Sequence, residues 1–388
     1  MFIKSVLALA VCVIIAVAGV CLPQPATAKE TVPIKVGVIF AVTGPAAFLG
    51  KPEANTVEMM MEQINAAGGV KGHKIELIIK DSQGNPEKAI SFAKQLIEED
   101  KVFAIIGPST TGETMKIKDI CEQAQTILIS CAAAEVIVNP VAKFVFKTPQ
   151  MDSQAVQRIY ETLQKLGIKD IGVVVSNTGF GTAGKAQLEK LAPTMGINIL
   201  ISETYDKEAT DLTAVLTKLK AQNVKAVVNW SIEPVQSIVP KNMRQIGFDV
   251  PLFQSHGFGN IKYVEAAGQA AEGIIFPAGR LLIAGDLPDT HPQKAVLVKY
   301  KKDYETKYQE AVSTFGGHAY DALLVLTRGI EAAGALDKEK VRTAIEGLKG
   351  LAGTAGVFTF SATDHCGLDL GAFEMLTVKG GKFVKYEK

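Results

Sequence analysis

The stretch Gly107-Pro108-Ser109-Thr110-Thr111-Gly112 follows an apolar run, residues 102–106, that predicts a buried strand. An amphipathic pattern after it predicts a helix that ends near Ala124. Three hydroxyl residues therefore stand where a strand passes into a helix N-terminus, which offers unpaired backbone N–H groups and the positive end of the helix dipole. The turn is a candidate site for a carboxylate or a phosphate. The alternative is helix capping alone, because Ser and Thr are good N-caps without any ligand.

Strand and helix patterns alternate on both sides of this turn. Residues 34–41, 74–79 and 127–130 read as further strands, with helices over 54–67 and after Asn85-Pro86. This order predicts an α/β unit, with a parallel sheet flanked by helices on both faces.

The alternation restarts after residue 150 and predicts a second α/β unit of similar size, which suits a chain of 388 residues. The chain becomes loop-rich over residues 277–292. The segments expected in the second unit and the tail are strands at 171–175, 197–203, 226–230 and 252–254, helices at 151–166, 212–221, 235–246, 293–308, 317–333 and 337–348, and strand-like pieces at 357–360, 372–378 and 383–386.

The first 28 residues have the pattern of a secretory signal peptide. Lys4 provides a positive start, residues 6–22 are apolar, and Ala26-Thr27-Ala28 forms a small-x-small cleavage site. We therefore expect cleavage after Ala28 and a periplasmic protein; the alternative is a retained membrane anchor. The 41 basic and 40 acidic residues are balanced and form no basic patch, which argues against nucleic-acid binding.

Three cysteines remain after the predicted cleavage: Cys121, Cys131 and Cys366. An odd number in an exported protein means at least one free thiol or an intermolecular bond, and buried structural thiols are the simplest interpretation. No His or Cys residues have metal-ligand spacing, so we expect no metal. The dinucleotide and P-loop glycine patterns are also absent from the sequence, so we expect no cofactor.

Both units carry ligand-friendly loops after their strands, where open α/β sheets bind ligands. A triad from Ser109, His256 and Asp81 is conceivable, but no GxSxG elbow surrounds any serine, so we expect no enzyme. The loops supply hydroxyls, small residues and aromatic side chains, the usual makeup of a ligand pocket, although core packing is the alternative for each aromatic residue. The aromatic candidates are Phe48, Phe180, Trp230 and Phe315.

Five stretches together resemble a known family. They are IKVGVIFAVTGPAAFLG (34–50), GGVKGHKIELIIKDSQGNP (68–86), IIGPSTTGETM (105–115), AAEGIIFPA (270–278) and STFGGHAYDALLVL (313–326). The chain resembles the periplasmic solute-binding proteins of branched-chain amino acid ABC importers, of the leucine/isoleucine/valine-binding type.

The resemblance implies a type I periplasmic binding fold, with two lobes joined by three crossings that close around a ligand. One lobe would hold residues 33–149 and 281–356, and the other residues 150–280 and 357–388. A membrane permease and an ATPase would receive the ligand from a monomeric binding protein. A periplasmic sensor that acts with a partner receptor is the alternative function.

The resemblance also implies roles for individual residues. The hydroxyl turn would hold the ligand carboxylate, a backbone group at Ala132 would meet the ligand head, and apolar side chains would form the pocket. The residues concerned are Ser109, Thr110 and Thr111 for the carboxylate, Leu49, Phe180 and Phe315 for the pocket, and Trp230 and Ile232 near a further pocket position.

Two positions depart from the family pattern. His256 replaces an acidic residue that grips the ligand ammonium, and Ala134 replaces a threonine. Burial of an ammonium without these partners would cost several kcal/mol. We therefore predict a ligand without an α-amino group, such as a small aliphatic or aromatic carboxylate or a 2-oxo acid, with His256 donating a hydrogen bond. Glu135 is the main alternative, because it could supply the missing carboxylate. The disulfide positions of the family are occupied by Gly84 and Thr110.

Overall fold

The computed structural model describes residues 31–387, and residues 32–388 form one compact unit that contains both predicted α/β regions. The predicted signal peptide lies outside the described residues. Within residues 31–387, none of the helices combines the length and the hydrophobicity needed to cross a bilayer.

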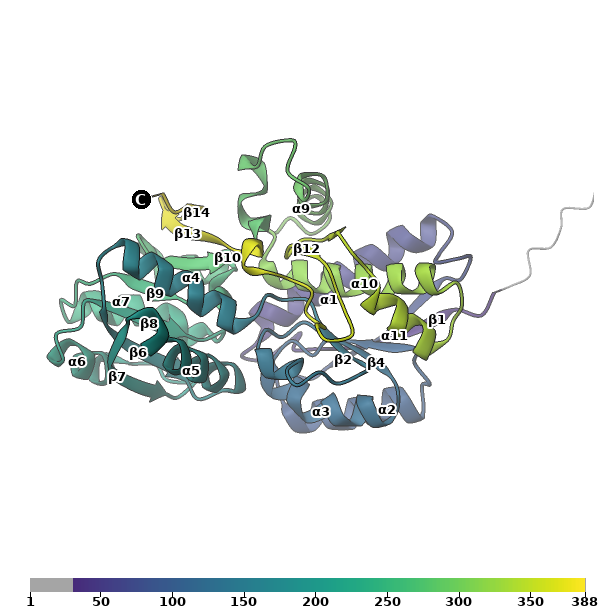
Figure 1. Cartoon of the computed structure of the whole chain (residues 1–388), viewed down its shortest axis with the longest axis horizontal. Helices are drawn as coiled ribbons and strands as arrows, with labels where there is room; N and C mark the ends of the chain where they lie inside the picture. Colours follow the sequence, from purple (N-terminus) through teal and green to yellow (C-terminus); the bar gives the residue numbers. More distant parts are fainter. Residues whose placement is uncertain (1–30, 388) are drawn as a thin grey trace, which may run out of the picture. The chain divides into compact units, whose positions relative to one another are not determined.

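The first sheet has five parallel strands in the order β2-β1-β3-β4-β5. Its central strands are almost entirely apolar and buried, as expected of a parallel sheet covered on both faces. Helices from distant parts of the chain flank it, including two from near residue 330 (Figure 1). The elements are β1 (Ile34–Phe40), β2 (Ile75–Asp81), β3 (Ala104–Ile106), β4 (Ile127–Ser130), β5 (Val145–Lys147), α1 (Ala47–Ala66), α2 (Pro86–Glu98), α3 (Thr111–Gln123), α10 (Thr314–Ala333) and α11 (Lys338–Glu346).

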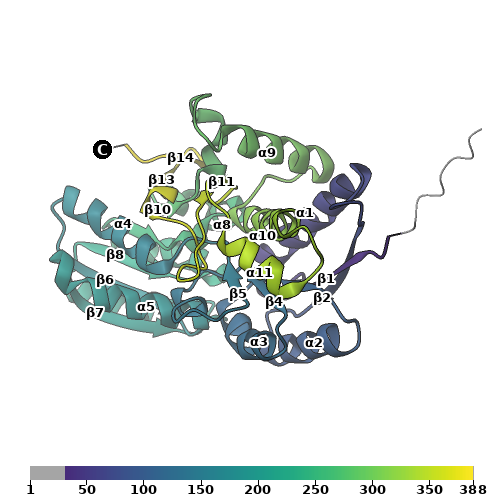
Figure 2. The same ribbon diagram turned by 45° about the vertical axis from the view of Figure 1, so that its right-hand side comes forward.

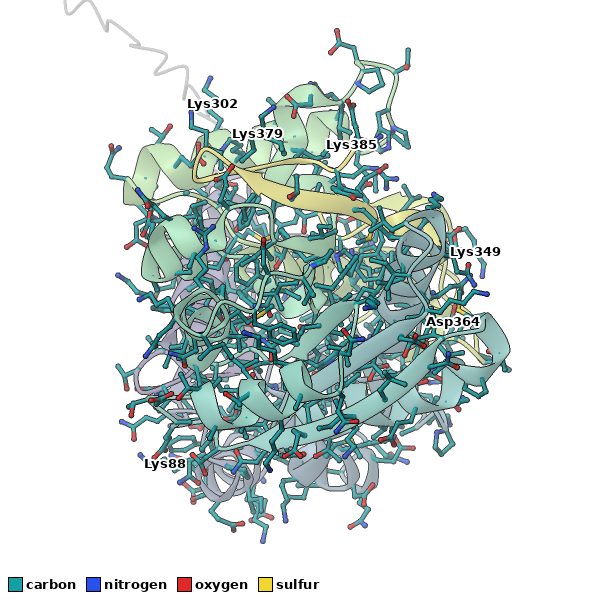
Figure 3. The ribbon with its side chains drawn as sticks, turned by 90° about the vertical axis from the view of Figure 1, so that its left-hand side faces the viewer. Lys88, Lys302, Lys349, Asp364, Lys379 and Lys385 are labelled. Atoms are coloured by element: carbon teal, nitrogen blue, oxygen red, sulfur yellow. The ribbon has the colours of Figure 1, made fainter. Side chains whose placement is uncertain are left out.

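The second sheet has seven strands in the order β14-β13-β10-β9-β8-β6-β7. The five strands from β10 to β7 are parallel, and the C-terminal hairpin adds two antiparallel strands at one edge. Lys379 and Lys385 lie on this hairpin (Figure 3). Lys385 is on the edge strand β14, where a lysine discourages pairing with another chain. The elements are β6 (Asp170–Ser176), β7 (Asn198–Tyr205), β8 (Ala226–Trp230), β9 (Leu252–Gln254), β10 (Ile275–Ala278), β13 (Glu374–Lys379), β14 (Lys382–Lys385), α4 (Asp152–Lys165), α5 (Gly179–Leu191), α6 (Thr213–Ala221), α7 (Ile238–Gln245) and α8 (Ile261–Ala267).

The structure confirms the two-lobed α/β fold and corrects several predicted elements. Helix α1 begins at Ala47 rather than at residue 54. The predicted start was too late because Pro52 suggests a helix break. The first turns of α1 nevertheless include Pro52 and Gly50, and Gly50 lies against the backbone of Ala41. The prediction also missed the short strands β5 and β10 and helix α8. Helix α9 (Lys294–Tyr308) packs against α1 through a small cluster that includes Met59 and Tyr300 (Figure 2).

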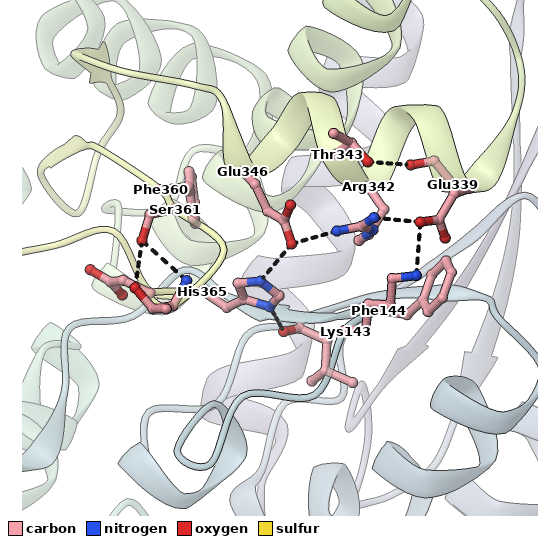
Figure 4. A network of polar contacts seen from close by, with 12 residues as sticks. Lys143, Phe144, Glu339, Arg342, Thr343, Glu346, Phe360, Ser361 and His365 are labelled. Atoms are coloured by element: carbon pink, nitrogen blue, oxygen red, sulfur yellow. Dashed lines mark hydrogen bonds and ion pairs between the residues drawn. The ribbon is translucent and has the colours of Figure 1, made fainter.

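The C-terminal segment after the short hairpin β11 (Leu351–Ala352) and β12 (Val357–Phe358) joins the two lobes. His365 anchors this segment: its Nδ1 lies 2.8 Å from the carbonyl oxygen of Val145, and its Nε2 lies 3.2 Å from Oε1 of Glu346 (Figure 4). Side chains up to Ala372 pack with the first core, and Phe373 and those after it pack with the second. The lobe boundaries remain a prediction, but this packing favours a third crossing near residue 372 rather than at 356.

Candidate functional site

Loops from both sheets meet at one cavity with about 320 Å³ of empty space. Part of this space is open to solvent, so the enclosed part of the cavity is smaller and suits only a small ligand. Eight of the candidate site residues named in the sequence analysis line it: Leu49, Ser109, Thr111, Ala132, Phe180, Ile232, His256 and Phe315.

The three hydroxyl residues of the 107–112 turn have three different environments. The Ser109 hydroxyl donates to the buried carboxylate of Glu53 and accepts from the Ala41 N–H at 3.0 Å, so its proton is already engaged. Thr110 is the N-cap of α3 and does not line the cavity. Thr111 lines the cavity, and its buried Oγ1 has no hydrogen-bond partner among residues 31–387. The first N–H groups of α3 also lack intrahelical acceptors. Within this turn, anion binding is therefore best supported for Thr111 and the start of α3, and Thr110 matches the capping alternative.

Thr111→Val is expected to weaken carboxylate binding by about tenfold or more, because a hydrogen bond to a charged group is worth about 1.5 to 3 kcal/mol. Valine keeps the shape of threonine, so the free energy of unfolding should change little. Thr110→Ala is the matched control: loss of the cap should cost about 1 kcal/mol of stability and leave affinity almost unchanged. Calorimetric titration and urea unfolding of both variants measure the two quantities. Equal affinity losses would contradict the separate roles.

The residues after β4 contribute less than predicted. The amide N–H of Ala132 is engaged by Ser130 Oγ at 3.1 Å, so only its carbonyl is available. Ala134 is fully buried outside the cavity lining. Glu135 also lies outside the lining, and its Oε1 accepts from Asn139 at 2.9 Å. The geometry therefore gives no support to Glu135 as the replacement for the family carboxylate.

His256 lines the cavity from the second lobe, in a short 3₁₀ turn after β9, η4 (His256–Phe258). Aromatic rings surround it edge-on, with centroids 5.4 Å away for Phe180, 5.6 Å for Trp230 and 5.7 Å for Phe373. Both ring nitrogens are buried and have no hydrogen-bond partner in the described part of the chain. Trp230 lies behind this wall rather than in the lining, so it supports the site through Phe180 and His256.

His318, on the first buried turns of α10, is a lining residue that the sequence analysis missed. Its Nδ1 is buried and has no partner among the described residues. Burial, followed by the charge of Lys147, lowers the pKa of His318 to about 3. Burial and the charges of Lys147 and His318 likewise hold the pKa of His256 well below its usual range. Both imidazoles are therefore neutral at pH 7. The sequence signal was its position at the start of the predicted helix 317–333, three residues after Phe315.

Charged groups lie around the cavity but not in its lining. No Asp or Glu side chain belongs to the lining, and the buried carboxyl group of Glu53 lies behind Ser109. The buried ammonium of Lys147 lies near the cavity and donates to the carbonyl oxygens of Pro149, at 2.7 Å, and Gln150, at 3.1 Å. Among residues 31–387, no group of three or more His, Cys, Asp or Glu side chains is arranged to hold a metal ion. The three described cysteines are free and buried, and Cys131 lines the cavity.

The two lobes touch at two neighbouring points beside the cavity. Asn260 Nδ2 donates to the carbonyl oxygen of Phe48 at 2.9 Å, and the Thr314 N–H donates to that of Gly259 at 2.9 Å. Phe180 and Ile232 line both this cavity and a larger outer cleft, so they separate the two spaces. The contacts show a closed arrangement in which the inner cavity is shielded.

Comparisons with known proteins agree with this architecture. The family described as periplasmic binding protein matches residues 33–373. A leucine-, isoleucine-, valine-, threonine- and alanine-binding protein of Pseudomonas aeruginosa is 28% identical over 317 residues, which cover 80% of this chain and 82% of that protein. An extracellular ligand-binding receptor from Rhodopseudomonas palustris HaA2 is 30% identical, with a TM-score of 0.86 over 92% of this chain and 100% of that one. LivJ of Streptococcus pneumoniae, a branched-chain amino acid transporter substrate binding protein solved with isoleucine, is 26% identical, with a TM-score of 0.79 and coverage of 90% and 97%.

Proposed function

Because the chain belongs to the periplasmic binding protein family, we propose that it is the solute-binding protein of an ABC importer of the branched-chain amino acid type. In this proposal the protein works in the periplasm after signal-peptide cleavage. It captures a small carboxylate between its lobes and delivers it to the permease and ATPase subunits. The cavity built from loops of both sheets supports this function, because ligand contacts from both sides would favour the closed state.

The ligand of this proposal lacks an α-amino group. The observation that carries it is the cavity lining, which contains two neutral imidazoles and no carboxylate. The P. aeruginosa relative is named for the amino acids that it binds, and the S. pneumoniae relative was solved with isoleucine. An ammonium in this cavity would lack a charged partner and would be repelled by Lys147, at a cost of several kcal/mol. A carboxylate without that ammonium can accept hydrogen bonds from the Thr111 hydroxyl and from the first N–H groups of α3, and the charge of Lys147 attracts it.

Titration of refolded, ligand-stripped protein with leucine and with 4-methyl-2-oxopentanoate tests this assignment. The two compounds share one carbon skeleton and differ only at the α carbon. We expect binding of the oxo acid in the micromolar range, worth about −8 kcal/mol, and leucine binding at least about 100-fold weaker. Micromolar leucine binding without a response to the oxo acid would refute the assignment. Uptake of the bound acid should also fall in cells that lack the protein, which tests delivery.

His256→Glu provides a gain-of-function control for the same experiment. The new carboxylate would stand where the family pattern has an acidic residue, and it would face the cavity from η4. We expect the preference to shift toward leucine, because an ammonium then has a charged partner. A leucine affinity unchanged from the wild type would show that position 256 does not set the preference.

A further inference from the structure

The neutral imidazole of His256 has an acceptor nitrogen to which no donor of residues 31–387 forms a hydrogen bond. A neutral imidazole carries one N–H donor and one acceptor nitrogen, whichever tautomer forms. Both nitrogens of His256 are buried, and neither has a hydrogen-bond partner in the described part of the chain. An unsatisfied buried polar group is costly. The ring therefore requires both an acceptor and a donor from the molecule that occupies the cavity.

Few ligand groups meet this requirement in this cavity. Carboxylate and oxo oxygens only accept, so they leave the lone pair of the imidazole unfilled. An ammonium donates, but no carboxylate lines the cavity to balance its charge. A carboxamide donates, but it adds a carbonyl and a second N–H that also need partners. A hydroxyl group can donate to the acceptor nitrogen of His256 without adding a charge, and the N–H on the opposite side of the ring then bonds to a separate acceptor atom.

We infer that the ligand is a small carboxylate that also carries a hydroxyl group, with the carboxylate at Thr111 and the start of α3 and the hydroxyl at His256. This inference rests on the proposed function and narrows its ligand class. The apolar side chains of Leu49, Phe180 and Phe315 line the rest of the cavity and suit a hydrocarbon body. Aliphatic 2-hydroxy acids and hydroxybenzoates share this chemistry, so the test includes both.

The test compares acids that differ in one group. The aliphatic arm uses 2-hydroxy-4-methylpentanoate, 4-methyl-2-oxopentanoate, 4-methylpentanoate and leucine; the aromatic arm uses 4-hydroxybenzoate, benzoate and 4-carbamoylbenzoate. Trp230 is the single tryptophan and packs 5.6 Å from His256, so its fluorescence reports occupancy alongside calorimetry. In at least one arm, we expect the hydroxy acid to bind about tenfold or more tightly than its partners.

Two variants assign the preference to one side chain. Phenylalanine can take the place of the His256 ring among aromatic neighbours but has no nitrogen, so His256→Phe should reduce the hydroxy acid to the affinity of the unsubstituted acid. Thr111→Val, which acts on the carboxylate, should weaken every acid by the same factor. His256→Gln keeps a donor group and an acceptor atom and should restore part of the preference. Circular dichroism and urea unfolding confirm that each variant folds.

The outcomes separate this inference from the proposed function. If the oxo, unsubstituted or carbamoyl acid binds as tightly as the hydroxy acid in both arms, the hydroxyl inference fails while carboxylate capture stands. If leucine binds tightest, or if no acid binds, the proposed ligand class fails as well. If the wild type prefers the hydroxy acid but His256→Phe keeps that preference, the hydroxyl is recognised by another group and the role given to His256 is overturned.

Discussion

Gly179→Ala is expected to weaken ligand binding about 10- to 100-fold without lowering the stability of the ligand-free protein. Gly179 is the first residue of α5 in the second lobe and faces the start of α3 in the first lobe. A Cβ atom at Gly179 would lie 2.9 Å from the amide nitrogen of Gly112 and 3.0 Å from its Cα. Neither of these backbone atoms can move away as a flexible side chain would. Crowding of this kind typically costs about 1 to 3 kcal/mol, and it arises only when the lobes are closed.

Gly112→Ala is the matched control for this closure contact. A Cβ atom at Gly112 would have no heavy atom within 4 Å, although the residue belongs to the same contact. Its affinity for the tightest-binding acid should therefore equal that of the wild type. Calorimetry measures the affinities, and urea unfolding without ligand measures the stabilities. Equal affinities for both alanine variants would show that α3 and α5 need not approach this closely for binding.

The sequence predicted the location of the site better than its chemistry. Strand and helix periodicity placed the 107–112 turn and the loop of His256 at the carboxyl ends of strands. In the structure both of these loops line the cavity. It could not tell that Ser109 bonds to Glu53 or that Thr110 only caps α3, because those partners come from tertiary packing. His318 was missed since it lies within a helix and not in a loop.

The fold shows the same division between local and long-range information. Apolar runs of four or more residues, such as 34–41 and 127–130, identified their strands correctly. Strand β10 was missed because Pro277 interrupts its apolar run and argues against a central strand. It pairs with a C-terminal hairpin about 100 residues later in the chain. Pro52 concealed the start of α1, whose first turn packs through Gly50 on Ala41, the residue directly after β1.

Asp321→Ala is expected to reduce the free energy of unfolding by about 3 kcal/mol or more near neutral pH. Asp321 is fully buried on α10, three residues after His318. Its Oδ1 accepts from the Thr354 N–H at 2.6 Å, and its Oδ2 accepts from the Ala355 N–H at 2.7 Å and from Thr354 Oγ1 at 3.0 Å. Alanine leaves two buried amide groups unpaired, each at a cost of about 1 to 3 kcal/mol.

The same variant should also change the pH dependence of stability. Burial raises the pKa of Asp321 to about 7, although its hydrogen bonds with Thr354 and Ala355 act in the opposite direction. The folded state then holds this proton more tightly than the unfolded state, whose aspartate pKa is about 3.9. Its contribution to stability is complete below the unfolded pKa and is lost as pH rises through 7. The loss caused by Asp321→Ala should therefore be about 2 to 3 kcal/mol larger at pH 5 than at pH 8.

Urea unfolding at both pH values measures this difference, with Asp249→Ala as the control at an exposed aspartate. The control should change stability little, because its side chain is exposed. A stability loss for Asp321→Ala that is the same at pH 5 and pH 8 would mean that the carboxyl is ionised in the folded protein throughout this range. The carbonyl oxygen of Ala355 also accepts a hydrogen bond from Gln150 Nε2 at 2.7 Å. Asp321 therefore holds, through Ala355, a segment that also bonds to the first crossing between the lobes.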